Sequence, residues 1–113
     1  MSEDRTENPK YVSWSKAVKV RDLYRCTICN VGDGAYVESH HKNSWDWDIL
    51  GRFSLDNGVT LCKPCHTNFH HIFSYGGNHE YQFEQFKKIY LIFKKIASSQ
   101  TPIDTSIIVS TEK

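Results

Sequence analysis

Two Cys-x-x-Cys pairs carry the clearest chemistry in the sequence: Cys26 with Cys29, and Cys62 with Cys65. Each pair can place two thiolates on one tight turn, and two such turns supply the corners of a tetrahedral zinc site with bonds of about 2.3 Å. Close cysteine pairs in a chain without a secretory signal are more often metal ligands than disulfides. The spacing therefore predicts a structural Zn²⁺ held by all four cysteines, with two disulfides as the alternative.

Histidines between and after these pairs form a second group. His40 and His41 are adjacent, Asn57 lies between them and the second cysteine pair, and His66 and His70 follow that pair. Residues four apart share one face of a helix, so His66 and His70 can point the same way. If His40 and His41 end a strand, these imidazoles can converge on one cation. The two cysteine turns would then hold the outer ends of the unit in place.

The elements that must position these residues follow from periodicity and from turn signals. Ser13 can cap a helix, the stretch before His41 has the alternation of a short strand, and Pro64 can open another helix. We expect, in chain order, a helix from Ser13 to about Asp22, a strand over 35–41, a loop over 42–56, a strand over 58–61, and helices over 65–73 and 80–98. This is the pattern of a small α+β domain.

The last of these helices has one aromatic face. Phe83, Phe86, Tyr90, Phe93 and Ala97 recur at spacings of three and four, which is the pattern of a helix face in a core or an interface. The opposite face carries Lys87, Lys88, Lys94 and Lys95. These lysines fit a solvated surface and a phosphate-binding surface equally well.

Composition indicates one soluble globular domain. Of the 113 residues, 39% are hydrophobic and 24% charged, and the mean hydropathy is −0.55. No apolar run approaches the roughly 20 residues that span a bilayer, and the polar, acidic first residues are unlike a secretory signal. We therefore expect a cytoplasmic protein without a membrane partner. Its predicted parts are a flexible acidic leader over 1–9, one domain over 10–100 and a flexible tail over 101–113.

The net charge of +1 is unevenly distributed. Residues 1–9 carry −2 and residues 101–113 carry −1, which leaves +4 on the residues between them. Five of the positive charges fall between Lys10 and Arg25, against Asp22 alone. A near-neutral chain argues against a strongly basic nucleic-acid binder, but this chain has a basic centre between acidic ends.

These features together resemble the HNH endonuclease family, whose ββα-metal fold is also called the His-Me finger. The resemblance covers residues 14 to 86, roughly two thirds of the chain. It rests on Trp14 followed by Arg21-Asp22-x-Tyr24-x-Cys26-x-x-Cys29, on Glu38-Ser-His40-His41, and on Asp56-Asn57-Gly58-Val-Thr-Leu61-Cys62-x-x-Cys65-His66-x-x-x-His70. Tyr75-Gly76 and Phe83-x-x-Phe86 are similar to the downstream segment of small phage-type and homing-type members.

The resemblance implies a ββα-metal core stapled by the four-cysteine zinc site and flanked by N-terminal and C-terminal helices. His41 matches the general base that takes a proton from the attacking water, a task that suits an imidazole with its ordinary pKa of about 6.5. His40 and His66 match the ligands of a catalytic divalent metal such as Mg²⁺, Mn²⁺ or Ni²⁺. Asn57 matches the residue that holds the loop between the strands. His70 matches a position that contacts phosphate or supplies a further ligand.

His40 departs from the pattern of many members, which have Asp at this position. A neutral nitrogen in place of an anionic oxygen should favour manganese, cobalt, nickel or zinc over magnesium. The pair also raises a geometric question, because neighbours on a flat strand point to opposite faces. The strand must therefore end, twist or bulge at His40 and His41.

We accordingly expect a metal-dependent HNH endonuclease that cuts or nicks double-stranded DNA, with a homodimer or a larger DNA-processing complex as further partners. Two alternatives stay open: a catalytically silent zinc-stapled DNA-binding module, and an accessory HNH protein of a phage DNA-packaging complex. A zinc ligand is the alternative for His66. Trp45 and Trp47 could pack on the zinc unit or touch DNA.

Overall fold

The computed structural model describes residues 5–99. Within them the chain forms three α-helices and one two-stranded sheet, which confirms the predicted α+β class. The elements are α1 (Pro9–Arg21), β1 (Val37–His41), β2 (Gly58–Cys62), α2 (Lys63–Phe73) and α3 (Glu80–Ser99), with short 3-10 turns at Arg5–Glu7, Ile49–Gly51 and Leu55–Asn57. The predicted tail, 101–113, lies outside the described residues.

Helix α1 begins at Pro9, four residues before the predicted start at Ser13. Asn8 caps it, because the Asn8 side chain accepts the backbone N–H of Lys10 at 2.8 Å and proline fits the first helical turn. Residues 5–7 form a 3-10 turn. The leader predicted over 1–9 therefore includes structured residues from Arg5 onward, and its first four residues lie outside the described part of the chain.

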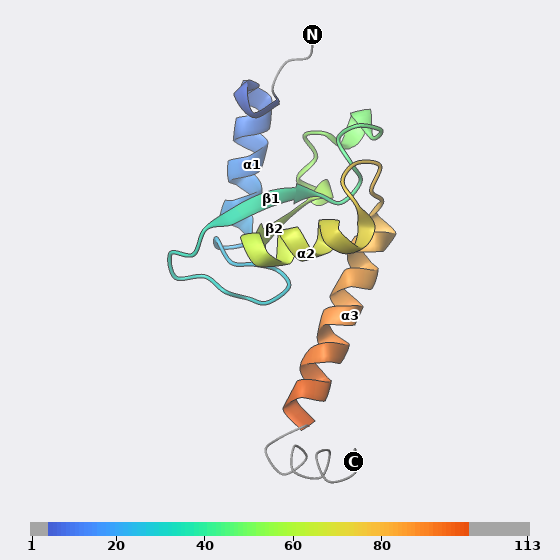
Figure 1. Cartoon of the computed structure of the whole chain (residues 1–113). Helices are drawn as coiled ribbons and strands as arrows, with labels where there is room; N and C mark the ends of the chain where they lie inside the picture. The colour runs from blue at the N-terminus through green and yellow to red at the C-terminus, as the bar shows by residue number, and fades with distance from the viewer. Residues whose placement is uncertain (1–4, 100–113) are drawn as a thin grey trace.

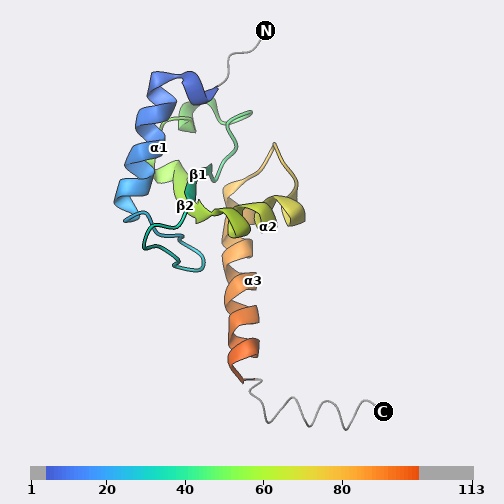
Figure 2. The same ribbon diagram turned by 60° about the vertical axis from the view of Figure 1, so that its left-hand side comes forward.

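The two strands are antiparallel and lie between helices. His40 pairs with Val59, and His41 with Gly58. Helix α1 lies against one face of the sheet and α2 with the start of α3 against the other (Figures 1 and 2). Because successive side chains of a strand point to opposite faces, this layering gives His40 and His41 different surroundings.

Gly58 allows α1 to lie close to the sheet. A Cβ atom at this position would lie 2.5 Å from a methyl carbon of Val18 and 2.7 Å from the ring of Trp14, both of which are buried residues of α1. Only glycine leaves room for these two side chains. The Asp-Asn-Gly sequence thus serves packing as well as the turn.

The core fills the space between the sheet, α2 and α3. Its members include Leu61, Phe69, Phe83 and Phe86, and three of the four cysteines are buried with them. The remaining cysteine, Cys29, is partly buried and packs against the same cluster. Among the described residues, cysteines thus make up three of the nine buried residues of this core cluster.

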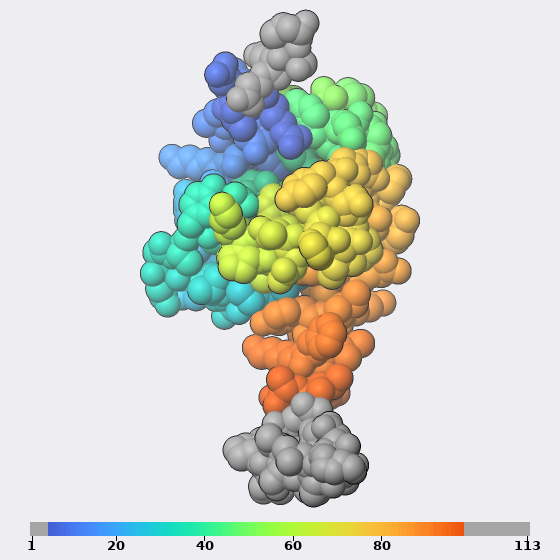
Figure 3. Space-filling model, viewed as in Figure 1, coloured from blue at the N-terminus to red at the C-terminus, as the bar shows by residue number. Residues whose placement is uncertain are grey.

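Helix α3 leaves the body of the molecule after its first turns (Figure 3). Phe83 and Phe86 are 2% and 5% exposed, whereas Phe93 is 66% exposed. The first half of the face predicted for a core or an interface therefore lies in the core, and its second half, at Phe93, is exposed. No helix in the described residues is long and apolar enough to span a membrane.

Candidate functional site

The four cysteines form one cluster. Their Sγ atoms all lie within 4.8 Å of one another, and Cys29 Sγ is 3.6 Å from Cys62 Sγ. This distance is far too long for a disulfide of about 2.05 Å, and it is close to the edge of about 3.8 Å of a tetrahedron with 2.3 Å bonds. The cluster could therefore hold a structural metal such as zinc, and the disulfide alternative is excluded because all four thiols are free.

The first turn of the cluster is shaped by hydrogen bonds to sulfur. Cys26 Sγ accepts the backbone N–H groups of Ile28 at 3.4 Å and Cys29 at 3.5 Å. Asn30 closes the turn with a left-handed backbone, at φ 67°. A hydrogen bond from the Cys65 thiol lowers the pKa of Cys26 to about 4. The turn thus favours the thiolate, which is the metal-binding form of cysteine.

Three imidazoles, one from β1 and two from α2, form a second cluster. His40 Nδ1 lies 3.3 Å from His66 Nε2, and His70 Nε2 lies 3.0 Å from the same atom. Ligands about 2.0–2.1 Å from one metal, at angles of 90° to 109°, are about 2.9–3.4 Å apart. The histidine triad therefore has the spacing of a metal site, and it includes His70, whose role the resemblance left open.

The positions of the hydrogen atoms on the His66 and His70 rings favour the binding of a cation by the triad. His66 Nδ1 lies 2.7 Å from Glu38 Oε1, and His70 Nδ1 lies 2.9 Å from the carbonyl oxygen of Ser74. Both oxygens are acceptors, so both Nδ1 atoms carry hydrogen and, in the neutral rings, both Nε2 atoms carry lone pairs. Two lone pairs that face each other at 3.0 Å repel unless a cation lies between them.

His40 completes this cluster from the sheet. The residue is 4% exposed, and burial lowers the pKa of its imidazole well below the ordinary value. Its ring meets Phe69 at 4.7 Å between centroids, and its Nε2 atom has no hydrogen-bond partner in the part of the chain described. The His40 ring is therefore neutral, and its Nδ1 atom, which lies 3.3 Å from His66 Nε2, can coordinate a metal ion.

His41 lies on the opposite face of the strand. Its ring stacks on Trp14 at 3.8 Å between centroids and 12° between planes. His41 Nε2 donates to the carbonyl oxygen of Arg52 at 2.8 Å, which leaves the lone pair on Nδ1. Burial lowers the pKa of His41 to about 4, so the ring is neutral near pH 7. The strand ends at His41, which answers the geometric question raised by the adjacent pair.

One cavity joins His41 to the triad. It has a volume of about 300 Å³. His41, the three histidines of the triad, Arg5 and Trp45 line it, among others. The Arg5 guanidinium lies 5.3 Å from the Trp45 ring and 6.0 Å from the Tyr11 ring. Among the lining residues of this cavity Arg5 carries the positive side chain. Sequence analysis missed it because it fell in the predicted leader.

Asn57 holds the loop that orients His41. Its Oδ1 accepts the N–H of Asn43 at 2.8 Å, and its Nδ2 donates to the carbonyl oxygens of Asn43 at 2.9 Å and Gly51 at 3.1 Å. These bonds close the loop between β1 and β2, and Arg52 lies directly after Gly51. Asn57 therefore acts on His41 through the loop backbone.

The remaining predicted residues take separate places. Trp45 meets the His41 ring edge-on at 5.7 Å, whereas Trp47 donates its Nε1 hydrogen to the carbonyl oxygen of Asn78 at 2.8 Å. His66 takes part in the triad, and the cysteine cluster is complete without it. Trp47 is 44% exposed, and of the two tryptophans Trp45 borders the cavity.

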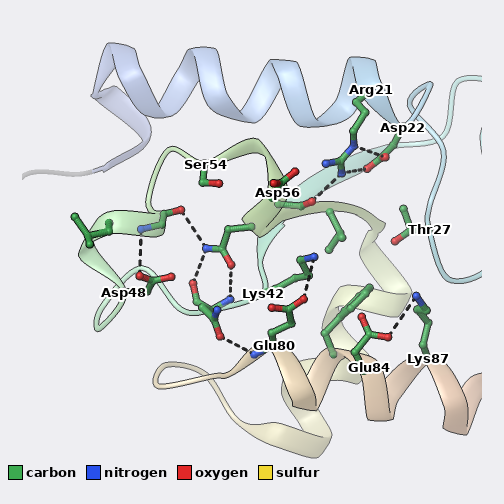
Figure 4. A pocket seen from close by; sticks show the side chains of 17 residues that line it. Arg21, Asp22, Thr27, Lys42, Asp48, Ser54, Asp56, Glu80, Glu84 and Lys87 are labelled. Carbon is green, nitrogen blue, oxygen red and sulfur yellow. Dashed lines mark hydrogen bonds and ion pairs between the residues drawn. The ribbon is translucent and has the colours of Figure 1, made fainter.

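A larger cavity of about 720 Å³ lies elsewhere, beside the start of α3 (Figure 4). Six of the charged side chains that line it form ion pairs with one another: Arg21–Asp22, Lys42–Glu80 and Lys87–Glu84. Asp48 and Asp56 also line it. In the described residues, the groups of three or more possible metal ligands are the cysteine cluster and the histidine triad alone. Because the histidine triad and His41 line the smaller cavity and not the larger one, the smaller cavity is the candidate site.

No protein-family model matches the chain, no curated protein matches it, and no solved structure matches it. The structure shows a small α+β fold with a four-cysteine cluster and a histidine triad near each other. The function proposed below therefore rests on the chemistry of these two clusters.

Glu38 is the other residue whose role sequence analysis missed. It lies two residues before His40 on β1, and this spacing, which places both on one face of the strand, is the signal that could have identified it. Burial raises the pKa of Glu38, but the interaction with His66, the hydrogen bond from Tyr36 and the charge of Lys63 together outweigh burial and lower it. The carboxylate is thus ionised and orients the His66 ring.

We expect Glu38→Gln to weaken metal binding at the triad by about 10- to 100-fold, the usual effect of removing a carboxylate behind a histidine ligand. Glutamine can still accept a hydrogen bond but carries no charge to make the imidazole more basic. Titration of the zinc-loaded protein with Ni²⁺ or Mn²⁺ measures the affinity. Glu84→Gln, on α3, is the matched control. Equal affinity in both variants would contradict a role for Glu38 behind His66.

Proposed function

We propose that the chain is a metal-dependent endonuclease of the HNH, or ββα-metal, type that hydrolyses phosphodiester bonds of double-stranded DNA. One observation carries the proposal. His41, with its lone pair on Nδ1, lines the same cavity as three imidazoles that converge on one point. A general base beside a cation site is the arrangement that phosphodiester hydrolysis requires.

The residues would divide the work as follows. His40, His66 and His70 would hold a divalent cation, which supplies positive charge to the phosphate and to the departing oxygen when bound. His41 would accept the proton of the attacking water at Nδ1, and the carbonyl oxygen of Arg52 would keep the ring in this orientation and stabilise its charged form. Stacking on Trp14 restricts the ring further.

Positive charge around the cavity supports a phosphate substrate. Arg5 lies at the cavity wall, held over Trp45, and a guanidinium can bind two phosphate oxygens at once. Lys10 and Lys16 are exposed on α1. This helix packs on the same face of the sheet as the His41 side chain. Contacts of this kind supply most of the affinity of a protein for the DNA backbone.

The donor set favours certain metals. Three neutral imidazole nitrogens suit manganese, cobalt, nickel or zinc better than magnesium, which prefers oxygen ligands. Glu38 binds His66 rather than facing the triad as a further ligand. We therefore expect stronger cleavage with Mn²⁺ or Ni²⁺ than with Mg²⁺.

Cleavage of supercoiled plasmid tests the proposal. The full chain, loaded with one zinc, is incubated with Mg²⁺, Mn²⁺ or Ni²⁺, and nicked and linear products are separated on a gel. We expect products with 5′-phosphate and 3′-hydroxyl ends, and none in the presence of a chelator. His79→Ala is the control, because the His79 ring contacts Trp47, at 4.6 Å between centroids, and is not part of the triad. Strong cleavage with Mg²⁺ alone would contradict the metal preference.

Absence of cleavage with every metal would contradict the proposed activity. DNA binding measured on the same preparations then separates the alternatives. Retained binding would favour a silent DNA-binding module, and loss of both would favour an accessory role in a larger complex.

A further inference from the structure

The outer half of α3 exposes large apolar side chains on one face. Ile92 and Phe93 are 57% and 66% exposed, and Ile89, which is partly buried, lies three and four residues before them. Side chains at this spacing form one continuous row on a helix. Figures 1 and 2 show this half of α3 extending beyond α2 and the sheet.

The row borders a groove between α2 and α3. The groove has a volume of about 340 Å³ and is lined by Ile72 of α2 and by Phe86, Ile89, Tyr90 and Phe93 of α3, among others. Ile72 is itself 52% exposed. The same surface therefore presents a protruding phenyl ring and a concave apolar groove beside it.

We propose that a second copy of this chain covers this surface, with Phe93 of each copy seated in the groove of the other. A two-fold contact uses one patch twice, so the patch must supply both the protruding group and the cavity that receives it. This surface supplies both.

The exposed area is sufficient for a weak dimer. The apolar side chains of the row and groove expose on the order of 400 Å² per copy, given the usual sizes of such side chains. Apolar atoms make up about 60% of an interface, so the full contact would bury roughly 1,300 Å² over both copies. This total is near the lower end of specific interfaces, so we expect reversible, concentration-dependent association.

The lysines of α3 do not drive this contact. Lys87 and Lys94 lie on the side of the helix opposite the row, whereas Lys88 and Lys95, four residues before and three after Ile92, lie beside it. The lysines of two copies carry like charges, so they cannot attract one another across the contact. Association through the row would depend on apolar burial, which added salt does not weaken. Binding of α3 to an anionic partner would weaken as salt rises.

Sedimentation velocity over a concentration series tests the proposal, with zinc-loaded full chain at low and high salt. We expect the wild type to dimerise at both salt concentrations and Phe93→Glu to raise the dimer dissociation constant by at least about 10-fold, because the charge would be buried. Leu91→Glu is the matched control, since Leu91 is 58% exposed on another face of the same helix. Its dissociation constant should equal that of the wild type.

Two results would overturn the proposal. The first is a wild type that stays monomeric at every concentration, whether or not it binds vesicles of mixed neutral and anionic phospholipid. The second is an equal effect of Phe93→Glu and Leu91→Glu. Zinc content and circular dichroism verify that the variants are folded. The experiment contains no DNA, so its outcome does not depend on the proposed nuclease activity.

Discussion

Replacement of His41 by Ala is expected to reduce plasmid cleavage by at least about 100-fold, and by as much as about 10,000-fold, the range for loss of a general base. The triad that would hold the metal lies on the other face of the strand. Metal binding at the triad should therefore be unchanged. Loss of cleavage with unchanged metal affinity is a result that a purely structural role for His41 would not give.

His41→Ala also removes a ring that stacks on Trp14, so stability must be separated from chemistry. His41→Gln offers this separation, because its amide nitrogen takes the place of Nε2 and can still donate to the carbonyl oxygen of Arg52, while it lacks a nitrogen lone pair. We expect His41→Gln to keep more of the thermal stability than His41→Ala and to be as inactive. Cleavage rates equal to those of the wild type in both variants would eliminate His41 as the base.

Removal of zinc from the cysteine cluster is the second large effect that we expect. Structural zinc sites contribute apparent binding free energies of about 10–16 kcal/mol in small domains. The usual free energy of unfolding of a domain is about 5–15 kcal/mol, so the loss of zinc can remove all of it. Strong chelation, or Cys62→Ser, should therefore unfold the domain. Circular dichroism and metal analysis by mass spectrometry report the result.

The control for this experiment is His66→Ala, which changes the triad and leaves all four cysteines. We expect this variant to retain about one zinc per chain and its fold. Fewer than about one zinc per chain in the wild type, after a mild chelator has removed the weaker ion, would argue against four-cysteine coordination. Native circular dichroism after complete zinc removal would show that the core alone stabilises the fold.

The two clusters are mechanically linked, which makes the effect of zinc extend to the candidate site. Cys65 and His66 are neighbours in the first turn of α2, and Cys62 ends β2 directly before it. A metal on the cysteines would fix where α2 starts and thereby the positions of His66 and His70. Zinc loss is thus expected to abolish metal binding at the triad as well.

The sequence by itself determined the elements and the cysteine cluster. Apolar periodicity, Pro64 and the glycine-rich turns placed both strands and all three helices within a few residues of their bounds, because these signals act over short stretches of chain. The paired Cys-x-x-Cys spacing indicated one cluster, since each pair forms a turn of its own. The start of α1 was missed because the Asn8 cap and Pro9 were assigned to the leader.

Only the tertiary structure decided how the histidines are used and which surfaces remain exposed. The helices on either side of the sheet placed His40 among the triad and His41 against Trp14. Glu38 and Arg5 contact the site through residues distant in sequence. Phe93 is exposed because this half of α3 extends beyond α2 and the sheet (Figures 1 and 2). Periodicity specifies which face a side chain occupies, but only the packing of distant segments determines what that face meets.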